Sequence, residues 1–559
     1  MKKPVLLIGI FITQTLLLSN PVPEDTILQV ATNWLELQTG QPRTANNWDA
    51  FPNSTNPLYY KINFNPGFVF VSADDSCIPI LTFCTLGNYY VDPSNEAAED
   101  LLLEYSLQIE DAKNNNRSNA DTLPIWNAIL NQTISIAEQH DIGFETPQWS
   151  GNGPYNNYCP WDNQNLIDGH HQRSLVGCVA TACAQICNYY KHWNYTLVDS
   201  DRYTSNNNNF ECAIDLDAAI HDFPDFTTLN GYLAEVDSRY NNNIPLTDSD
   251  KAALSFACGI LVHIQYSSPA SSGGHGGLVY TKLNMHCQLA EASSYTSETW
   301  INLIKNQLEL NRPVEYHGQR TDVWGGHAYI ITGFQATNMN TTLNLVNWGR
   351  HWRLLEYWSL QPINPANDYP LQHSMLYGIA PNASVNQTIQ LVNGSTDYSG
   401  IHIYAIGHDG VSKTLTTDNG VFEFGLPPGT YDFTITDIGN YYLPIQICDI
   451  SIQTGTNYIS PDPIVLTLKP NVVVVPTDVP TIPEAIDLVR NKGTVAIRNG
   501  SYTVSGLNWQ DKHIKLQGQS QSGVIITNDP NSGLPAIQLS GIGIDNQDLI
   551  SNVTFSNCD

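Results

Sequence analysis

The sequence predicts a multidomain protein in which two α+β units are followed by two all-β units. A chain of 559 residues with 42% hydrophobic residues is too long for a single core, so three or four domains are expected. Between residues 146 and 382 the helical patterns come first and the strand-like runs later, which is typical of a two-lobed α+β domain. After Asn382 the pattern changes to short alternating runs separated by turn signals.

The first twenty residues have the features of a secretory signal. Met1-Lys2-Lys3-Pro4 supplies positive charge, and a mostly apolar run over residues 5–18 follows it. The alternative is a permanent membrane anchor, but a spanning helix needs about 20 apolar residues and this run is shorter. We therefore expect a signal peptide at residues 1–20, no stable membrane anchor, and a secreted, extracellular protein.

The net charge excludes one class of partners. The chain has 24 Lys and Arg residues against 53 Asp and Glu residues, which gives a formal net charge of −29. This charge repels nucleic acid and anionic membrane surfaces, so we expect no nucleic-acid partner.

The eleven cysteines form no dense or regular framework. Export permits disulfides, but large cores do not require them, so few or none are expected. Cys183 and Cys187 lie one helical turn apart, which raises the possibility of a metal pair. No second pair of metal-ligand type lies nearby, so small buried residues on a helix are the better interpretation. We expect no metal and no organic cofactor.

Residues 21–145 are predicted to form a compact α+β unit, followed by a processing site in or just after His140–Glu145. Helical and strand-like patterns alternate along this segment. They are helical at residues 27–37, strand-like at 59–64 and 68–72, and helical again at 95–113 and 124–139.

Cys178 is the first candidate for a catalytic residue. Gly177-Cys178 ends a loop just where an Ala-rich helical pattern begins, so the thiol would lie at a helix N-terminus. Free backbone N–H groups and the helix dipole favour thiolate over thiol at that position, which makes a cysteine nucleophilic. The alternative is a buried structural thiol.

Further helical patterns lie near Ser249–Leu261 and Ser297–Leu310.

Two later motifs complete a Cys, His, Asn order. His327 follows Gly325-Gly326 and precedes an apolar β-branched run. Asn347 ends another strand-like run and is followed by Trp348. This order and rough spacing are papain-like. A core position is the alternative interpretation for His327 and for Trp348.

The motifs resemble the streptopain family of cysteine peptidases, which has a papain-like fold. The resemblance rests on GCVATACAQICNYYKHW, RPVEYHGQ, WGGHAYIITGF and LNLVNWG, and it covers about residues 145–382. Upstream, Gly67–Asp75 and Leu103–Glu110 resemble the inhibitory propeptide of that family. The resemblance implies an inhibitory propeptide at residues 21–145 and a papain-like, streptopain-type peptidase domain at residues 146–382.

The resemblance also implies a secreted cysteine endopeptidase made as a zymogen. Cys178 would attack the peptide carbonyl to form a thioester, and His327 would hold the thiolate and protonate the leaving amine. Asn347 would orient the ring of His327, and Trp348 would shield that bond from water. Gln172, six residues before the nucleophile, would donate to the oxyanion together with the Cys178 N–H, although a solvated loop glutamine is as ordinary an interpretation.

The chain departs from the family pattern after Trp348. Gly349 is followed by Arg350-His351-Trp352 instead of a glycine-rich continuation, so cleft shape and substrate preference do not follow from the family. His317 stands where a glutamine is common and is a second candidate base. The glycine-rich run Ser271–Gly277 is either a mobile cleft loop or a flexible linker.

The last two segments are predicted to be all-β. Residues 386–468 contain TTDNGVFEFGLPPGTYDFTIT, which resembles carboxypeptidase-regulatory β-sandwich modules, and show no catalytic cluster. Residues 470–559 resemble the opening rungs of pectate-lyase-like, right-handed parallel β-helices. Such solenoids need at least about three stacked repeats, so this partial β-helix is either a stub or the start of something longer.

Two alternative functions stay open. One is an inactive homologue that acts as an adhesin or binding scaffold, which the substitutions after Trp348 favour. The other places the function in the C-terminal modules, as glycan binding or a polysaccharide lyase. Residues 470–559 show neither an acidic calcium cluster nor an Arg/Lys catalytic pair, which argues against the lyase. The expected partners are protein or peptide substrates, the propeptide as an intramolecular inhibitor, and a surface glycan.

Overall fold

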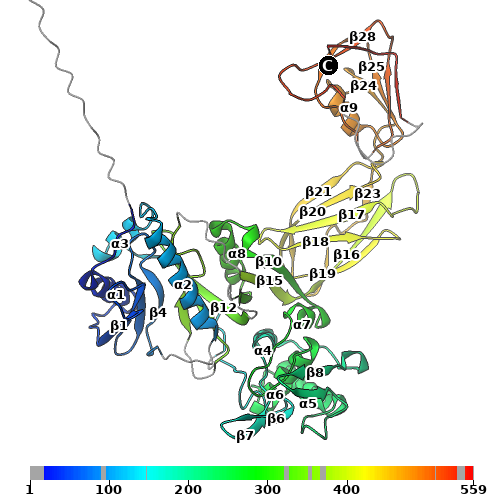
Figure 1. The fold of residues 1–559 in the computed structure, drawn as a ribbon. Helices are drawn as coiled ribbons and strands as arrows, with labels where there is room; N and C mark the ends of the chain where they lie inside the picture. The colour runs from blue at the N-terminus through cyan, green and yellow to red at the C-terminus, as the bar shows by residue number, and fades with distance from the viewer. Residues whose placement is uncertain are drawn as a thin grey trace, which may run out of the picture. The chain divides into compact units, whose positions relative to one another are not determined.

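The structure is a computed structural model that describes residues 18–89, 96–145, 148–319, 326–350, 355–365, 373–509, 512–537 and 548–557. The chain divides into two compact units, Met1–Pro381 and Asn382–Asp559 (Figure 1). Residues 1–17 lie outside the described residues, so the signal peptide stays a prediction. Within the described ranges, no helix combines the length and the apolar character needed to cross a membrane.

A sheet of eleven described strands runs through the first unit. Its order is β1 (Asn47–Phe51), β2 (Tyr59–Asn63), β3 (Phe68–Ser72), β4 (Ile80–Cys84), β14 (Glu356–Trp358), β13 (Thr342–Asn347), β12 (Gly326–Thr337), β11 (Val314–Gln319), β15 (His373–Pro381) and β10 (Met285–Glu291), with β5 (Ile136–Asp141) also paired to β12. The pairing of β4 with β14 sets Phe83 opposite Tyr357. The sheet therefore joins the predicted propeptide to the predicted peptidase domain.

The helices of the first unit pack on this sheet or on one another. They are α1 (Glu24–Thr39), α2 (Glu96–Asn114), α3 (Leu123–Leu130), α4 (Cys178–Tyr190), α5 (Phe226–Asn241), α6 (Asp248–Leu261), α7 (Gly277–Lys282) and α8 (Ser297–Glu309). The start of α6 is fixed by a capping box between Thr247 and Asp250. α4 packs against α6 and β12, and α2 packs against β11 and β12. One hydrophobic core runs through all of them and includes Trp34, Tyr105 and Trp348.

Two short hairpins lie outside the large sheet. They are β6 (Trp161–Ile167) with β7 (His170–Arg173), and β8 (Thr204–Asn207) with β9 (Phe210–Ala213). The hairpin of β6 and β7 leads directly to Cys178.

One predicted helix is wrong in its second half. The pattern at residues 124–139 gives helix only over α3, and β5 follows after Gln132, whose φ is +54°. The β-branched residues Thr133, Ile134 and Ile136 suit a strand better than a helix. Pairing of β5 with β12, about 200 residues later, decides between the two.

The second unit contains three groups of strands. One sheet holds β16 (Ala383–Leu391), β19 (Val421–Leu426), β22 (Thr456–Tyr458) and β23 (Ile464–Leu466), and another holds β17 (Ile401–Gly407), β18 (Ser412–Thr416), β20 (Gly429–Asp437) and β21 (Ile445–Ile452). Residues of both sheets share one core. Tyr431, Phe433 and Ile435 of β20 point into it at every second position, as strand alternation requires.

The third group is built from parallel strands. It comprises β24 (Val472–Val475), β25 (Thr494–Ile497), β27 (Lys515–Gly518) and β29 (Leu549–Ser551) in one sheet, and β26 (Gly500–Val504), β28 (Val524–Asn528) and β30 (Thr554–Ser556) in another. Helix α9 (Ile482–Leu488) packs on β24 and β25. Each described pair in these two sheets is parallel, and a separate core lies among them.

Candidate active site

Cys178 is the first residue of α4, and its side chain is half-buried. The preceding Gly177 has a φ of +89°, which residues other than glycine rarely adopt. A Cβ atom at this position would lie 2.9 Å from Cδ1 of Ile264. Gly177 also has no side chain to cap the first N–H groups of α4. The local structure therefore presents the thiol to the positive end of the helix dipole.

His327 is the second residue of β12, where it pairs with Gly318 of β11. Successive strand residues point to opposite faces, so His327 shares its face with Tyr329. The ring of Tyr329 lies 4.7 Å from that of Trp348. Ala328 and Ile330 point to the other face, which is the one that α4 covers. The described register does not bring His327 to the α4 side of the sheet.

Asn347 ends β13 opposite Ile330, three residues along β12 from His327. The side chain is 1% exposed. Its Nδ2 donates to Oε1 of Gln185 on α4 at 2.9 Å, and its Oδ1 accepts from the Gly349 N–H at 3.0 Å. The carboxamide thus links the sheet to the helix that carries Cys178.

Trp348 is a core residue. Its indole packs against Tyr329 and, at 5.2 Å between ring centroids, against Trp358. Its Nε1 donates to Oε2 of Glu356 at 3.3 Å. These are the contacts of a core residue, which agrees with the alternative interpretation of Trp348. The substituted residues His351 and Trp352, and the Trp324-Gly325 pair before His327, lie outside the described residues.

Gln172 lies on β7 and is exposed. Its backbone pairs with Asp162, and its Nε2 donates to the Ile167 carbonyl at 3.5 Å, which is a long hydrogen bond. The side chain is therefore largely solvated, and its role as an oxyanion donor stays a prediction.

Glu315 and His317 form a pair on the face of the sheet that α4 covers. Of these two residues, the sequence identifies only His317. His317 Nε2 lies 2.8 Å from Glu315 Oε1, and the Glu315 side chain is fully buried. Glu315 also accepts from the Tyr280 hydroxyl at 2.5 Å and from the Gly276 N–H at 3.1 Å. The sequence points to His317 as a candidate base but does not single out Glu315. The signal that could have found it is the spacing, since residues two apart on a strand share a face.

The contact between His317 and Glu315 favours opposite charges on the two side chains. Burial opposes the charge on His317, but the hydrogen bond to Glu315 and its charge outweigh burial and raise the pKa of His317, and Cys178 acts in the same direction. Burial likewise opposes the charge on Glu315, but His317, Tyr280 and Gly276 outweigh it and lower the pKa of the carboxyl. A histidine favoured in its charged form therefore lies within electrostatic reach of Cys178.

The glycine-rich run Ser271–Gly277 ends in tight packing, so neither a mobile loop nor a flexible linker describes its last residues. A Cβ on Gly276 would lie 2.2 Å from Glu315 Oε2 and 2.6 Å from Cys183 Sγ. A Cβ on Gly273 would lie 2.4 Å from Ile264 Cδ1. These glycines allow the backbone to approach Glu315, Cys183 of α4 and Ile264 closely.

Helix α2 of the predicted propeptide is anchored to the opposite face. Glu104 Oε2 lies 2.9 Å from His373 Nε2, and the Tyr105 hydroxyl donates to the Ser359 carbonyl at 2.6 Å. His373 pairs with Gly318 in the sheet and bonds to the hydroxyl of Tyr316, so it lies on the face that the register gives His327. The predicted propeptide therefore covers that face.

The segments described above match two families. Residues 149–358 match the Peptidase C10 family, and residues 19–109 match the Spi protease inhibitor family. The segment that contains Cys178, His327 and Asn347 is therefore similar to cysteine peptidases of the C10 family, and the preceding segment is similar to a protease inhibitor. Streptopain of Streptococcus pyogenes serotype M28 (strain MGAS6180) is 27% identical over 337 residues, which cover 56% of this chain and 76% of streptopain.

Two solved structures from Prevotella intermedia are also similar to this chain. The prointerpain A fragment is 21% identical with a TM-score of 0.41, and the match covers 59% of this chain and 98% of the fragment. Active interpain A is 23% identical with a TM-score of 0.31, and the match covers 43% of this chain and 95% of interpain A.

A cysteine-type peptidase needs an accessible thiol. The ten cysteines that the structure describes are free thiols, and only Cys178, Cys287 and Cys448 among them are not buried. Cys448 lies outside the segment that matches the peptidase family. Cys287 lies within strand β10, where burial raises the pKa of its thiol to about 12. Cys178 is therefore the described thiol best suited to act as the nucleophile.

Proposed function

We propose that this protein is a C10-type cysteine peptidase that hydrolyses peptide bonds in protein substrates with Cys178 as the nucleophile. The observation that carries the proposal is the position of Cys178, half-buried, at the start of α4 directly after Gly177. No other described cysteine combines incomplete burial with a helix N-terminus.

In the proposed reaction, the Cys178 thiolate attacks the carbonyl carbon of the scissile bond. The carbon–nitrogen bond breaks as His327, in its imidazolium form, gives its proton to the leaving amine. The acyl group stays on sulfur as a thioester, which water hydrolyses after giving a proton to the imidazole. The Cys178 N–H and Gln172 are the proposed oxyanion donors.

The position of His327 connects the reaction to the zymogen. In the described register His327 points to the face that α2 covers, away from α4. We infer that release of the propeptide, residues 21–145, lets the first residues of β12 turn His327 towards Cys178. His317 is the alternative base, because it already lies on the α4 face. Asn347 then acts by holding β13 on α4 through Gln185.

The test is active-site labelling of the processed enzyme with an epoxide-type thiol inhibitor. Peptide mapping is expected to find the label on Cys178, together with loss of hydrolysis of a protein substrate. Absence of both hydrolysis and label on Cys178 would contradict the proposal. It would favour the alternative of an inactive homologue that acts as a binding scaffold.

We also propose secretion through a signal peptide at residues 1–20, and surface attachment through the C-terminal modules. The two sheets with a shared core support a β-sandwich at residues 386–468. The parallel pairs support a partial right-handed β-helix at residues 470–559. Retention of the Cys178→Ala protein on an insoluble polysaccharide, compared with the same protein ending at residue 382, tests the attachment. Equal retention of both would remove the glycan-binding role.

A further inference from the structure

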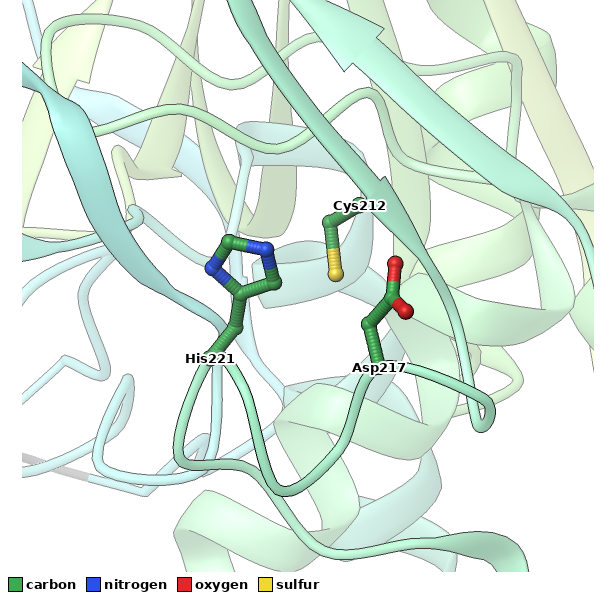
Figure 2. Close-up of side chains that lie close together, drawn as sticks. All are labelled: Cys212, Asp217 and His221. Carbon is green, nitrogen blue, oxygen red and sulfur yellow. The ribbon is translucent and has the colours of Figure 1, made fainter.

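A second cluster of side chains with metal-binding atoms lies outside the candidate active site. Cys212 is on β9, and Asp217 and His221 follow in the next turns of the chain. Figure 2 shows the three side chains converging, with the sulfur between the imidazole ring and the carboxylate. One ligand atom from each residue lies within 4.8 Å of the others.

The local backbone explains why these side chains meet. The His221 N–H donates to the Asp217 carbonyl at 3.0 Å, which is one helical turn, so the two side chains project on the same side. Oδ2 of Asp217 accepts from the N–H of Ala213 at 2.7 Å. Because Ala213 directly follows Cys212, this bond fixes the carboxylate beside the thiol.

The imidazole has the right tautomer to be a ligand. Nδ1 of His221 lies 3.2 Å from the carbonyl oxygen of Trp161. A carbonyl only accepts, so Nδ1 carries the hydrogen and Nε2 keeps its lone pair in the neutral ring. Figure 2 shows the nitrogen farther from the backbone directed towards the sulfur. A hydrogen bond from the second ring nitrogen to a backbone carbonyl is the usual support of a metal-binding histidine.

The surroundings favour a specific ligand over a solvated cluster. The Cys212 side chain is fully buried and that of His221 is 7% exposed, whereas Asp217 is partly open to solvent. One side of the cluster is thus closed by protein and the other can admit water.

We propose that Cys212, Asp217 and His221 form a Zn²⁺ site with three protein ligands and one water. A thiolate, an imidazole and a carboxylate together suit a borderline-soft cation such as Zn²⁺, which is commonly four-coordinate with these groups. Ca²⁺ and Mg²⁺ are disfavoured because they take oxygen ligands.

The proposed Zn²⁺ site is connected to the β6–β7 hairpin, which precedes Cys178 in the chain. Trp161, at the start of β6, also donates its N–H to the His221 carbonyl at 2.6 Å. Arg173, at the end of β7, donates to Asp222 Oδ2 at 2.6 Å and to the Cys159 carbonyl at 2.8 Å. Both ends of the β6–β7 hairpin are therefore tied to the loop that contains His221. Bound Zn²⁺ would stabilise this hairpin.

A second group of similar residues provides the internal comparison. His408 Nε2 lies 3.3 Å from Asp432 Oδ1 and 3.8 Å from Asp449 Oδ1, and the neighbouring Cys448 is exposed. The side chains of His408 and Asp449 are also exposed. A hydrogen bond on a solvated surface accounts for this group, and the group can be used to detect nonspecific binding.

The experiment measures Co²⁺ and Zn²⁺ binding to the full chain carrying Cys178→Ser, which removes the candidate nucleophile as a ligand. We expect one tight site per chain, with a thiolate-to-cobalt charge-transfer band and the visible bands of tetrahedral Co²⁺, both lost on adding Zn²⁺. Cys212→Ser should remove the charge-transfer band. Asp217→Asn and His221→Gln should weaken Zn²⁺ binding by at least about tenfold.

Cys448→Ser and His408→Gln are the matched controls and should leave the band and the affinity unchanged. Melting curves without metal show which variants fold. If Cys212→Ser does not fold, the nearly isosteric Asp217→Asn and His221→Gln variants decide the question. The proposal is overturned if the Cys178→Ser protein binds no Zn²⁺ tightly, if these two variants bind as tightly as their parent, or if the band follows Cys448.

Discussion

The position of the Cys178 thiol at the start of α4 depends on the backbone conformation of Gly177, the residue before it. Gly177 combines a positive φ with close contact to Ile264, whereas Gly40 has a φ of +64° and no atom within 4 Å of the point where a Cβ would lie. The two glycines therefore differ both in backbone conformation and in the room for a side chain. Both effects at Gly177 act within one residue of the proposed nucleophile.

We expect Gly177→Ala to lower the free energy of unfolding more than Gly40→Ala does. The left-handed helical backbone of Gly40 costs alanine about 1–2 kcal/mol, whereas φ +89° with ψ 143° at Gly177 belongs to a region that is nearly reserved for glycine, and Gly177→Ala also adds a clash. Urea unfolding measures the difference, and kcat/KM on a peptide should fall only for Gly177→Ala. Equal destabilisation with full activity would contradict both the backbone argument and the steric argument at Gly177.

We expect Cys178→Ala and His327→Ala to lower kcat/KM by more than about a thousandfold with folding intact, because each removes a reacting group. His317→Gln should keep activity within about tenfold. The measurement is hydrolysis of a fluorogenic peptide by the processed enzyme. If His317→Gln is inactive and His327→Ala is active, His317 is the base.

The Glu315–His317 pair should make stability depend on pH. The pKa of His317 is raised above 6.5, so its contribution is complete below about pH 6.5 and is lost as the pH rises through the folded value. The pKa of Glu315 is lowered below 4.5, so its contribution is complete above about pH 4.5 and is lost in acid. The charge pair is therefore most stabilising between these two values.

We accordingly expect Glu315→Gln, in a Cys178→Ala background, to cost more unfolding free energy at pH 5.5 than at pH 9. Urea unfolding at both pH values checks this. A cost that is the same at both would mean that Glu315 acts only through its neutral hydrogen bonds to Tyr280 and Gly276.

Strand pairing ties the propeptide to the peptidase domain more closely than the sequence patterns suggested. β4 pairs with β14, β5 pairs with β12, and α2 packs on β11 and β12. Glu138 of β5 forms an ion pair with Lys305 of α8, and Glu145 forms one with Lys251 of α6. Release of the propeptide must therefore break part of the sheet.

We expect the Cys178→Ala protein to accumulate with residues 21 to about 145 attached, while active protein sheds them, because processing needs the nucleophile. Intact-mass spectrometry of both proteins checks this and locates the new N-terminus. A cut before residue 136 would leave β5 in the mature enzyme. Equal processing of both proteins would point to a separate convertase.

Local patterns predict the helices of this chain better than its strands. The helices near Ser249–Leu261 and Ser297–Leu310 are confirmed as α6 and α8, because their periodicity and their N-terminal caps are local. The patterns predict no strand at β1 and a helix over most of β5. Both strands owe their conformation to partners in the sheet, with β5 pairing across about 200 residues.

The separation of the chain into two units leads to a prediction about truncation. The compact units divide between Pro381 and Asn382, and the hydrophobic cores on either side are distinct. A protein ending at residue 382 keeps β15, which is the strand of the large sheet that comes last along the chain.

We expect this truncated protein to hydrolyse short peptides with nearly unchanged kcat/KM, since such substrates contact only the peptidase domain. The full-length processed enzyme is the control. A folded truncated protein that loses more than about tenfold, equivalent to ~1.4 kcal/mol of transition-state stabilisation, would show that the C-terminal modules help to build the site.

The sequence by itself indicated the change of pattern after Asn382, the similarity to cysteine peptidases, and the position of Cys178 at the start of a helix, because these depend on composition and on residues close together in the chain. Only the tertiary structure decided that Asn347 holds Gln185, that Glu315 pairs with His317, and that His327 lies on the face covered by α2. Each of these depends on strand register or on helix packing between distant segments. A shift of one residue in register would exchange the faces, and no local pattern encodes it.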